Sequence, residues 1–169
     1  MIQDKLSTQR LHLERLQPDD HAFMRALVNT PGWIEFIGDR NVHSQADALA
    51  YIDRIMNTEN LYYWVARTRE TNTPIGVVSF LKRSYLDHFD IGFAFLPEFQ
   101  GAGYALEGAK AVLDMVRDQP EYQPVLATIL PHNVNSVRLL EKLGLRFERI
   151  MQVNEDTLHI YTTSAEQPV

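Results

Sequence analysis

The chain of 169 residues contains no cysteine. Disulfide bonds, zinc–thiolate sites and thiolate nucleophiles are therefore excluded together. The chain also lacks any stretch close to the roughly 18 apolar residues of a membrane-spanning helix. Its N-terminus lacks the long apolar segment after a charged start that marks a signal peptide. We therefore expect an intracellular, cytoplasmic protein.

Basic residues are in the minority, with 16 Lys and Arg against 22 Asp and Glu and a net charge of −6. Phosphate backbones and anionic surfaces are bound by basic patches, so we expect neither nucleic acid nor a membrane as partner. The acidic balance is compatible with a cationic substrate, although most acidic proteins are merely soluble. The histidines, at positions 12, 21, 43, 88, 132 and 159, show no ligand spacing, and no metal is expected.

Apolar residues are plentiful enough for one core, at 45% of the chain. A chain of this length is normally one domain and buries roughly 70% of its unfolded surface on folding. The sequence shows no internal repeat and no low-complexity segment. We therefore expect a single domain over residues 1–169.

Hydrophobic periodicity predicts the order of the elements, β-α-α-β-β-β-α-β-α-β-β. Three consecutive strands without a helix between them indicate an antiparallel meander, and the strand–helix–strand unit at 90–130 can place its two strands parallel. The fold class is thus α+β, a mixed and mostly antiparallel sheet flanked by helices. The predicted strands are 11–14, 62–66, 75–81, 90–96, 125–130, 147–153 and 157–161. Helices begin at Pro18, at Ser44 and after Asn133, the stretch 97–105 opens a further helix that runs to about Arg117, and residues 31–39 form a linker.

The segment from Pro97 to Ala105 is a glycine-containing turn between an apolar strand and a helix. Backbone N–H groups at a helix start are free, and the helix dipole favours negative charge there, so the segment predicts a site for a phosphate-bearing ligand. A Rossmann fingerprint from Gly101 would need glycine or alanine where Leu106 stands. A Walker A loop from Gly103 is also incomplete, because the chain continues Gly-Ala-Lys from position 108.

The pattern that remains, Gln100-x-x-Gly103-x-Ala105, resembles the acyl-CoA loop of the GCN5-related N-acetyltransferase (GNAT) superfamily. Residues 131–145 resemble a later motif of that family, an Asn-x-x-Ser start followed by Leu-Glu-Lys-Leu-Gly. Together the two motifs, in this order, make the resemblance specific, and it covers nearly the whole chain. It is closest to the branch of the ribosomal-protein N-terminal acetyltransferases, and residues 32–40 also look like an uncharacterised bacterial subset of that branch.

The resemblance implies an acetyl-CoA-dependent N-acetyltransferase. Its acceptor would be a primary amine, on a small molecule or at a protein or peptide N-terminus, and transfer would occur by direct attack in a ternary complex. The lack of cysteine is consistent with a reaction that forms no acetyl-enzyme. The alternative is a non-catalytic acyl-CoA-binding sensor or interaction module. We expect a monomer or a homodimer.

The same resemblance implies which residues hold acetyl-CoA. Main-chain N–H groups of the glycine-containing loop would bind the pyrophosphate, because glycines let the backbone approach a phosphate closely. The strand before the loop would splay from its neighbour, leaving a gap for the pantetheine; its residues are equally compatible with a plain core strand. The implied positions are Phe93, Phe95, Leu96, Gln100, Gly101, Ala102, Gly103, Tyr104 and Ala105.

Asn133 and Ser136 start the later motif and have two interpretations each. Asn133 matches an asparagine that touches the cofactor in the family, and asparagine is also a favoured helix N-cap. Ser136 matches a serine that can protonate the thiolate in this branch, and is otherwise an ordinary first-turn serine. Many members use a tyrosine four residues later as the acid, where this chain has Leu140.

Asp90 is the candidate general base, because this branch often has an acidic residue just before the cofactor strand. Asp87 and His88 lie beside it, but the whole segment can equally be a polar hairpin. Glu35 and Asp39 are weaker candidates for the base, from the linker that borders the acceptor pocket in the family.

Trp33, Phe36 and Arg40 share that linker and are the candidate acceptor-binding residues. The two aromatic side chains would form a wall, and the guanidinium would hold a carboxylate of the substrate. Packing of the linker onto the core is the other use of such aromatic residues.

Overall fold

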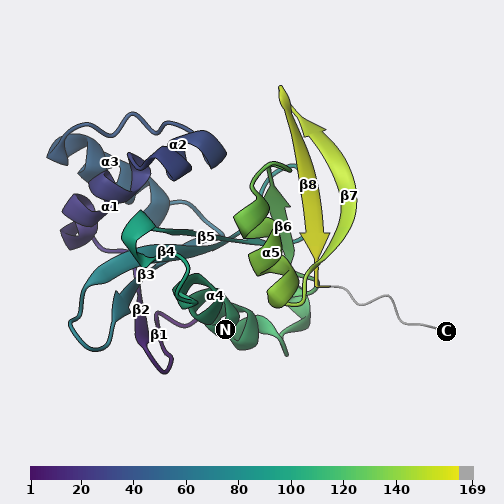
Figure 1. Cartoon of the computed structure of the whole chain (residues 1–169), viewed down its shortest axis with the longest axis horizontal. Coiled ribbons are helices and arrows are strands. Elements are labelled where there is room, and N and C mark those ends of the chain that lie inside the picture. The colour runs from purple at the N-terminus through teal and green to yellow at the C-terminus, as the bar shows by residue number, and fades with distance from the viewer. Residues whose placement is uncertain (164–169) are drawn as a thin grey trace.

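The computed structural model describes residues 1–163 and contains one eight-stranded sheet in the order β1-β2-β3-β4-β5-β6-β8-β7 (Figure 1). Neighbouring strands pair antiparallel except β5 and β6, which pair parallel. The expected mixed, mostly antiparallel sheet flanked by helices is therefore confirmed. The strands are β1 (Lys5–Ser7), β2 (Leu11–Arg15), β3 (Leu61–Thr68), β4 (Pro74–Leu81), β5 (Asp90–Phe95), β6 (Leu126–Ile129), β7 (Arg146–Val153) and β8 (Asp156–Thr162).

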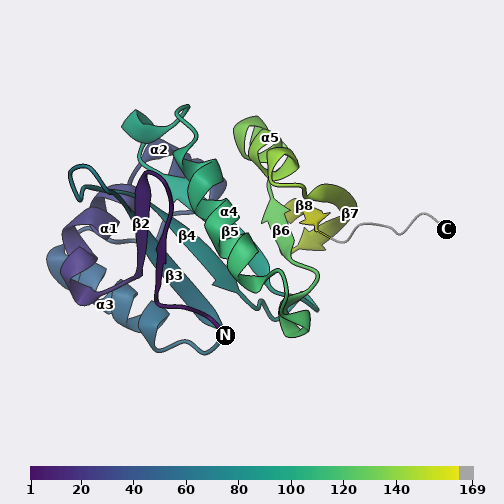
Figure 2. The ribbon, with the colours of Figure 1, turned by 90° about the horizontal axis from the view of Figure 1, so that it is seen from below.

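Helices cover both faces of this sheet (Figures 1 and 2). Apolar side chains of α1 and α3 pack against β3 and β4 on one face, and Trp33 of α2 joins the same cluster. The stripe of α4 formed by Ala109, Val112 and Val116 packs on the other face together with Leu140 of α5. The helices are α1 (His21–Val28), α2 (Pro31–Phe36), α3 (Gln45–Met56), α4 (Tyr104–Val116) and α5 (Val134–Lys142), with short 3-10 turns at Pro18–Asp20, Pro97–Phe99 and Pro120–Tyr122.

Two predictions about the elements were wrong. The expected linker contains helix α2, which starts because the Thr30 hydroxyl accepts a hydrogen bond from the Trp33 N–H at 3.3 Å, with Pro31 in its first turn. The three-residue strand β1, paired with β2, was not expected. Both elements are too short to show a hydrophobic period. The expected domain over 1–169 also includes residues 164–169, which lie outside the described residues.

The sheet opens between β5 and β6, and this opening positions the site. Asp90 and Leu126 form the pair that joins these strands, and within residues 1–163 no later residue of β5 pairs with β6. The other edge of β5 is paired with β4 along its whole length. In Figure 2, α4 lies over the β4–β5 side of the opening and α5 lies beside β6. None of the helices in this described part of the chain is long and apolar enough to cross a membrane.

Candidate active site

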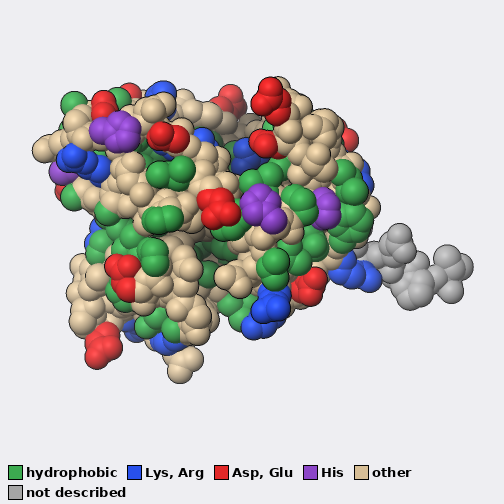
Figure 3. Space-filling view, turned by 45° about the horizontal axis from the view of Figure 1, so that its top comes forward, with side chains coloured by type: hydrophobic (Ala, Val, Ile, Leu, Met, Phe, Trp, Pro, Cys, Tyr) green, Lys and Arg blue, Asp and Glu red, His purple; other side chains and the backbone are tan. Residues whose placement is uncertain are grey.

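A cavity of about 520 Å³ lies where the sheet opens. Its wall is formed by α2, the end of β5, the glycine-containing loop, the start of α4 and one face of α5. The molecular surface is hollowed between the half of the molecule that contains β1–β5 and the half that contains β6–β8 (Figure 3). This volume lies within the roughly 300–1,000 Å³ range of ligand pockets. Of the candidate residues, the lining contains Trp33, Phe36, Phe93, Phe95, Gln100, Gly101, Gly103, Tyr104, Ala105, Asn133 and Ser136.

The two glycines of the loop differ in what lies beside them, although both have a positive φ. Gly101 has a φ of +80°, and a Cβ built on it would meet nothing within 4 Å. Gly103 has a φ of +83° and is the N-cap of α4; a Cβ built on it would lie 3.3 Å from Nη2 of Arg10. The open side of Gly101 therefore allows a ligand to approach the backbone closely, whereas Gly103 leaves room for an arginine of the protein itself.

The end of β5 is joined to the loop by Gln100, whose side-chain amide donates to the carbonyl oxygen of Phe95 at 2.9 Å. The Phe95 ring is buried in the core below this bond, and Phe93 is half-buried on the same face. Because the edge of β5 that faces β6 has no partner strand at Phe93, this backbone edge can bind an extended ligand as a neighbouring strand would.

The start of α5 brings polar groups to the opposite wall. The Asn133 side-chain oxygen accepts a hydrogen bond from the Ser136 N–H at 3.4 Å, so Asn133 is the N-cap of this helix. Ser136 is half-buried and lines the cavity; Leu140, one turn further, is buried in the core.

Two cationic side chains on the same wall, Arg138 and Lys142, were missed by the sequence analysis. The signal available was their i, i+4 spacing on α5, the helix of the later motif. They give this end of the cavity a positive charge, which suits an anionic ligand.

Helix α2 forms the outer wall and contacts the turn before α5. Glu35 and His132 approach to 3.8 Å, and the rings of Phe36 and His132 have centroids 5.2 Å apart. Trp33 is 4% exposed, and its buried indole N–H has no hydrogen-bond partner among residues 1–163. Both aromatic residues of α2 line the cavity, while Trp33 is also packed into the core cluster on the α1–α3 face.

Asp90 lies apart from the cavity lining, at the closed end of the opening between β5 and β6. Its side chain is 2% exposed, and its Oδ2 accepts a hydrogen bond from Nε of Arg83 at 3.0 Å and one from the Thr128 hydroxyl at 3.5 Å. Its Oδ1 is buried without a partner in the described part of the chain. Burial raises the pKa of Asp90 above its ordinary value, and the charge and hydrogen bond of Arg83 offset part of that rise.

Three other candidates also lie outside the lining. Leu96 packs against the cluster on the α1–α3 face, and Arg40 is exposed. Ala102 points its carbonyl oxygen towards Nη1 of Arg10, at 2.9 Å. Among residues 1–163, no group of three or more His, Cys, Asp or Glu side chains is arranged to hold a metal ion.

Comparison with known proteins identifies similar sequences and folds. The family model described as an acetyltransferase (GNAT) domain matches residues 10–146. An uncharacterized N-acetyltransferase of Bacillus subtilis (strain 168), YnaD, is 26% identical over 143 residues, which are 85% of this chain and 83% of that protein.

Solved structures share the fold at low identity. A GnaT-family acetyltransferase from Bordetella pertussis superposes with a TM-score of 0.79 at 20% identity, covering 96% of this chain and 100% of that one. RimL, a ribosomal L7/L12 alpha-N-protein acetyltransferase solved with coenzyme A, superposes with a TM-score of 0.78 at 16% identity, covering 92% of this chain and 94% of that one.

Proposed function

The chain belongs to the acetyltransferase (GNAT) domain family, and we propose that it is an acetyl-CoA-dependent N-acetyltransferase whose acceptor is a primary amine. The observation that carries the proposal is the continuous cavity, which joins the open edge of β5 to the glycine-containing loop at the start of α4. Transfer would proceed by direct attack in a ternary complex, since the chain has no cysteine to carry an acetyl group.

The residues present fit acetyl-CoA. The free N–H groups at the start of α4 and the open side of Gly101 suit a diphosphate, with Arg138 and Lys142 on the facing wall as counter-charges. The unpaired edge of β5 suits an extended pantetheine chain. When bound, acetyl-CoA supplies the acetyl group as an activated thioester.

Proton transfer at the site would involve two side chains. Ser136 lines the cavity, and its hydroxyl would donate a proton. The Asp90 carboxyl is proposed to accept a proton at Oδ1, and that oxygen is buried without a partner among residues 1–163. Because Asp90 lies outside the lining, a proton would reach it through water rather than by direct contact.

The acceptor would enter beside α2, where Trp33 and Phe36 provide an aromatic wall. At pH 7 an α-amine of pKa near 7.8 is roughly one part in seven neutral, whereas a lysine amine near 10.4 is about one part in 2,500. Because the Asp90 carboxylate lies away from the cavity lining, the site favours an amine that is already partly neutral, namely an α-amine or another amine of low pKa. RimL, with the same fold, is named as acting on a protein α-amine.

The test is release of free CoA thiol from acetyl-CoA, measured over a panel of amines and N-terminal peptides. Stimulation by a subset of acceptors is the expected result. Gly101→Val is the matched control, because its branched side chain would enter the cavity and should abolish any activity that belongs to this site. Tight binding of CoA without amine-dependent thiol release would instead favour the sensor function, and failure to bind CoA would contradict the proposal.

A further inference from the structure

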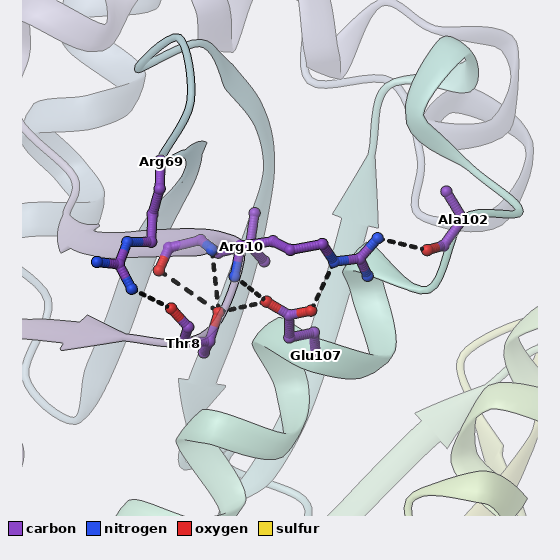
Figure 4. A network of polar contacts seen from close by, with 6 residues as sticks. Thr8, Arg10, Arg69, Ala102 and Glu107 are labelled. Atoms are coloured by element: carbon purple, nitrogen blue, oxygen red, sulfur yellow. Dashed lines mark hydrogen bonds and ion pairs between the residues drawn. The ribbon is translucent and has the colours of Figure 1, made fainter.

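Arg10, the residue before β2 and outside the cavity lining, connects three parts of the molecule (Figure 4). Its Nε donates to Oε1 of Glu107 in α4 at 2.8 Å, and its Nη1 donates to the carbonyl oxygen of Ala102 in the loop at 2.9 Å. Its guanidinium also lies 4.2 Å from the centre of the Tyr104 ring. One side chain thus holds the loop against the first turn of α4.

The bond from Arg10 to Ala102 has a consequence for the next peptide group. In a planar trans peptide the C=O and N–H bonds point in opposite directions. Because the Ala102 carbonyl is held towards Arg10, the N–H of Gly103 must point away from it. The built Cβ position of Gly103 also lies on the arginine side, 3.3 Å from Nη2, and Gly103 itself lines the cavity.

Glu107 anchors the guanidinium, and its charge would otherwise act against an anion bound at the start of α4. The helix dipole favours a carboxylate in the first turn, but that carboxylate repels a second anion bound at the same helix start. Partial burial alone would raise the pKa of Glu107, but hydrogen bonds from the Thr8 hydroxyl and from Arg10 hold that pKa below its ordinary value. The carboxylate is therefore charged, and the guanidinium compensates that charge next to the loop.

We propose that Arg10 is a positioning residue that fixes the glycine-containing loop so that the Gly103 N–H faces the bound diphosphate. The inference rests on the proposed use of this cavity for acetyl-CoA. It assigns to Arg10 an effect on the binding of the acetyl donor and none on the transfer step itself.

The experiment measures binding of CoA by calorimetry, and steady-state rates with an acceptor found in the amine panel. Arg10→Met should weaken CoA binding roughly 10- to 100-fold, the range for losing a hydrogen bond to a charged group. The KM for acetyl-CoA should rise by a similar factor, while kcat at saturation and the KM for the amine change less than about twofold. A general loss of folding would not produce this split.

Two further variants make the test decisive. Arg69→Met is the matched control, because Arg69 donates to the carbonyl oxygen of Thr8 in the same network but does not contact the loop; its CoA affinity should equal that of the unmodified chain. Arg10→Lys keeps the positive charge beside Glu107 but cannot reproduce the fork in which two nitrogens bind two partners. It should bind CoA more weakly than the unmodified chain, even if Arg10→Met fails to fold.

Unchanged CoA affinity in Arg10→Lys or in Arg10→Met would overturn the inference. A fall in kcat without a rise in the KM for acetyl-CoA would overturn it as well. If the unmodified chain does not bind CoA, the proposed function fails instead, so the two failures are distinguishable.

Discussion

Alanine at Gly101 and at Gly103 should damage the same loop by different routes. Both positions have φ near +80°, where an L-residue is strained. The alanine methyl at 101 would meet no protein atom within 4 Å and would occupy space on the cavity side. The methyl at 103 would instead press on Nη2 of Arg10, 3.3 Å from the built Cβ, and disturb the bond from Arg10 to the Ala102 carbonyl.

The cost in stability follows from the backbone conformation. A left-handed conformation costs an L-residue about 1–2 kcal/mol. For a chain of this size, 1 kcal/mol lowers Tm by roughly 2–4 °C, so each variant should melt about 2–8 °C lower. Gly103→Ala should melt at the lower temperature of the two, because the displaced guanidinium adds to the strain.

A double-mutant cycle in CoA affinity separates the two routes. If the methyl at 103 acts through Arg10, its effect should shrink in the Arg10→Met background, with a coupling of about 0.5–3 kcal/mol. The methyl at 101 acts on the ligand space, so its effect should add to that of Arg10→Met. Calorimetry with CoA and thermal unfolding followed by circular dichroism give both quantities. Strict additivity at 103, or wild-type melting of both variants, would refute the reasoning.

Three other outcomes are expected. A raised folded pKa means that Asp90 contributes stability below the ordinary aspartate pKa and loses that stability as pH rises through the folded pKa. In urea denaturation, Asp90→Asn should therefore gain stability relative to the unmodified chain as pH rises above about 4, the ordinary aspartate pKa, and a difference that stays constant with pH would contradict the raised pKa. Ser136→Ala should lower kcat about 10²–10⁴-fold with CoA affinity nearly unchanged, and a full rate would exclude its role as acid. Initial-rate plots against both substrates should intersect, whereas parallel lines or a stable acetyl adduct by mass spectrometry would indicate a covalent route.

Much of the fold could be predicted because its longer elements carry strong local patterns. The stripe of α3 and the apolar run of β4 appear in the structure where periodicity placed them. Helix α2 was missed since six residues give less than two turns, although Thr30 followed by Pro31 was an available capping signal. The opening of the sheet was expected only from the family resemblance, because strand pairing is a non-local property.

The position of Asp90 illustrates that limit. The sequence placed it at the entrance of the cofactor strand, and β5 does begin there. Whether a strand's first residue lies at the open or the closed end of a splayed pair depends on where the neighbouring strand pairs. The pairing of Asp90 with Leu126 puts it at the closed end, and Arg83 then becomes its partner. Its role as base stays a prediction that the pH and rate measurements address.

The residues that line the cavity could be predicted from the sequence more easily than the residue that holds the loop in place. The loop from Gln100 to Ala105 is a contiguous motif. Its two glycines have a positive φ, a local property that the sequence pattern can indicate. Arg10 acts on the same loop from 97 residues before its partner Glu107, and no spacing rule links the two positions. Arg10 holds the carbonyl oxygen of the exposed Ala102, and this bond sets the orientation of the peptide group that follows. The motif itself does not demand this donor, so only the folded chain reveals that Arg10 supplies it.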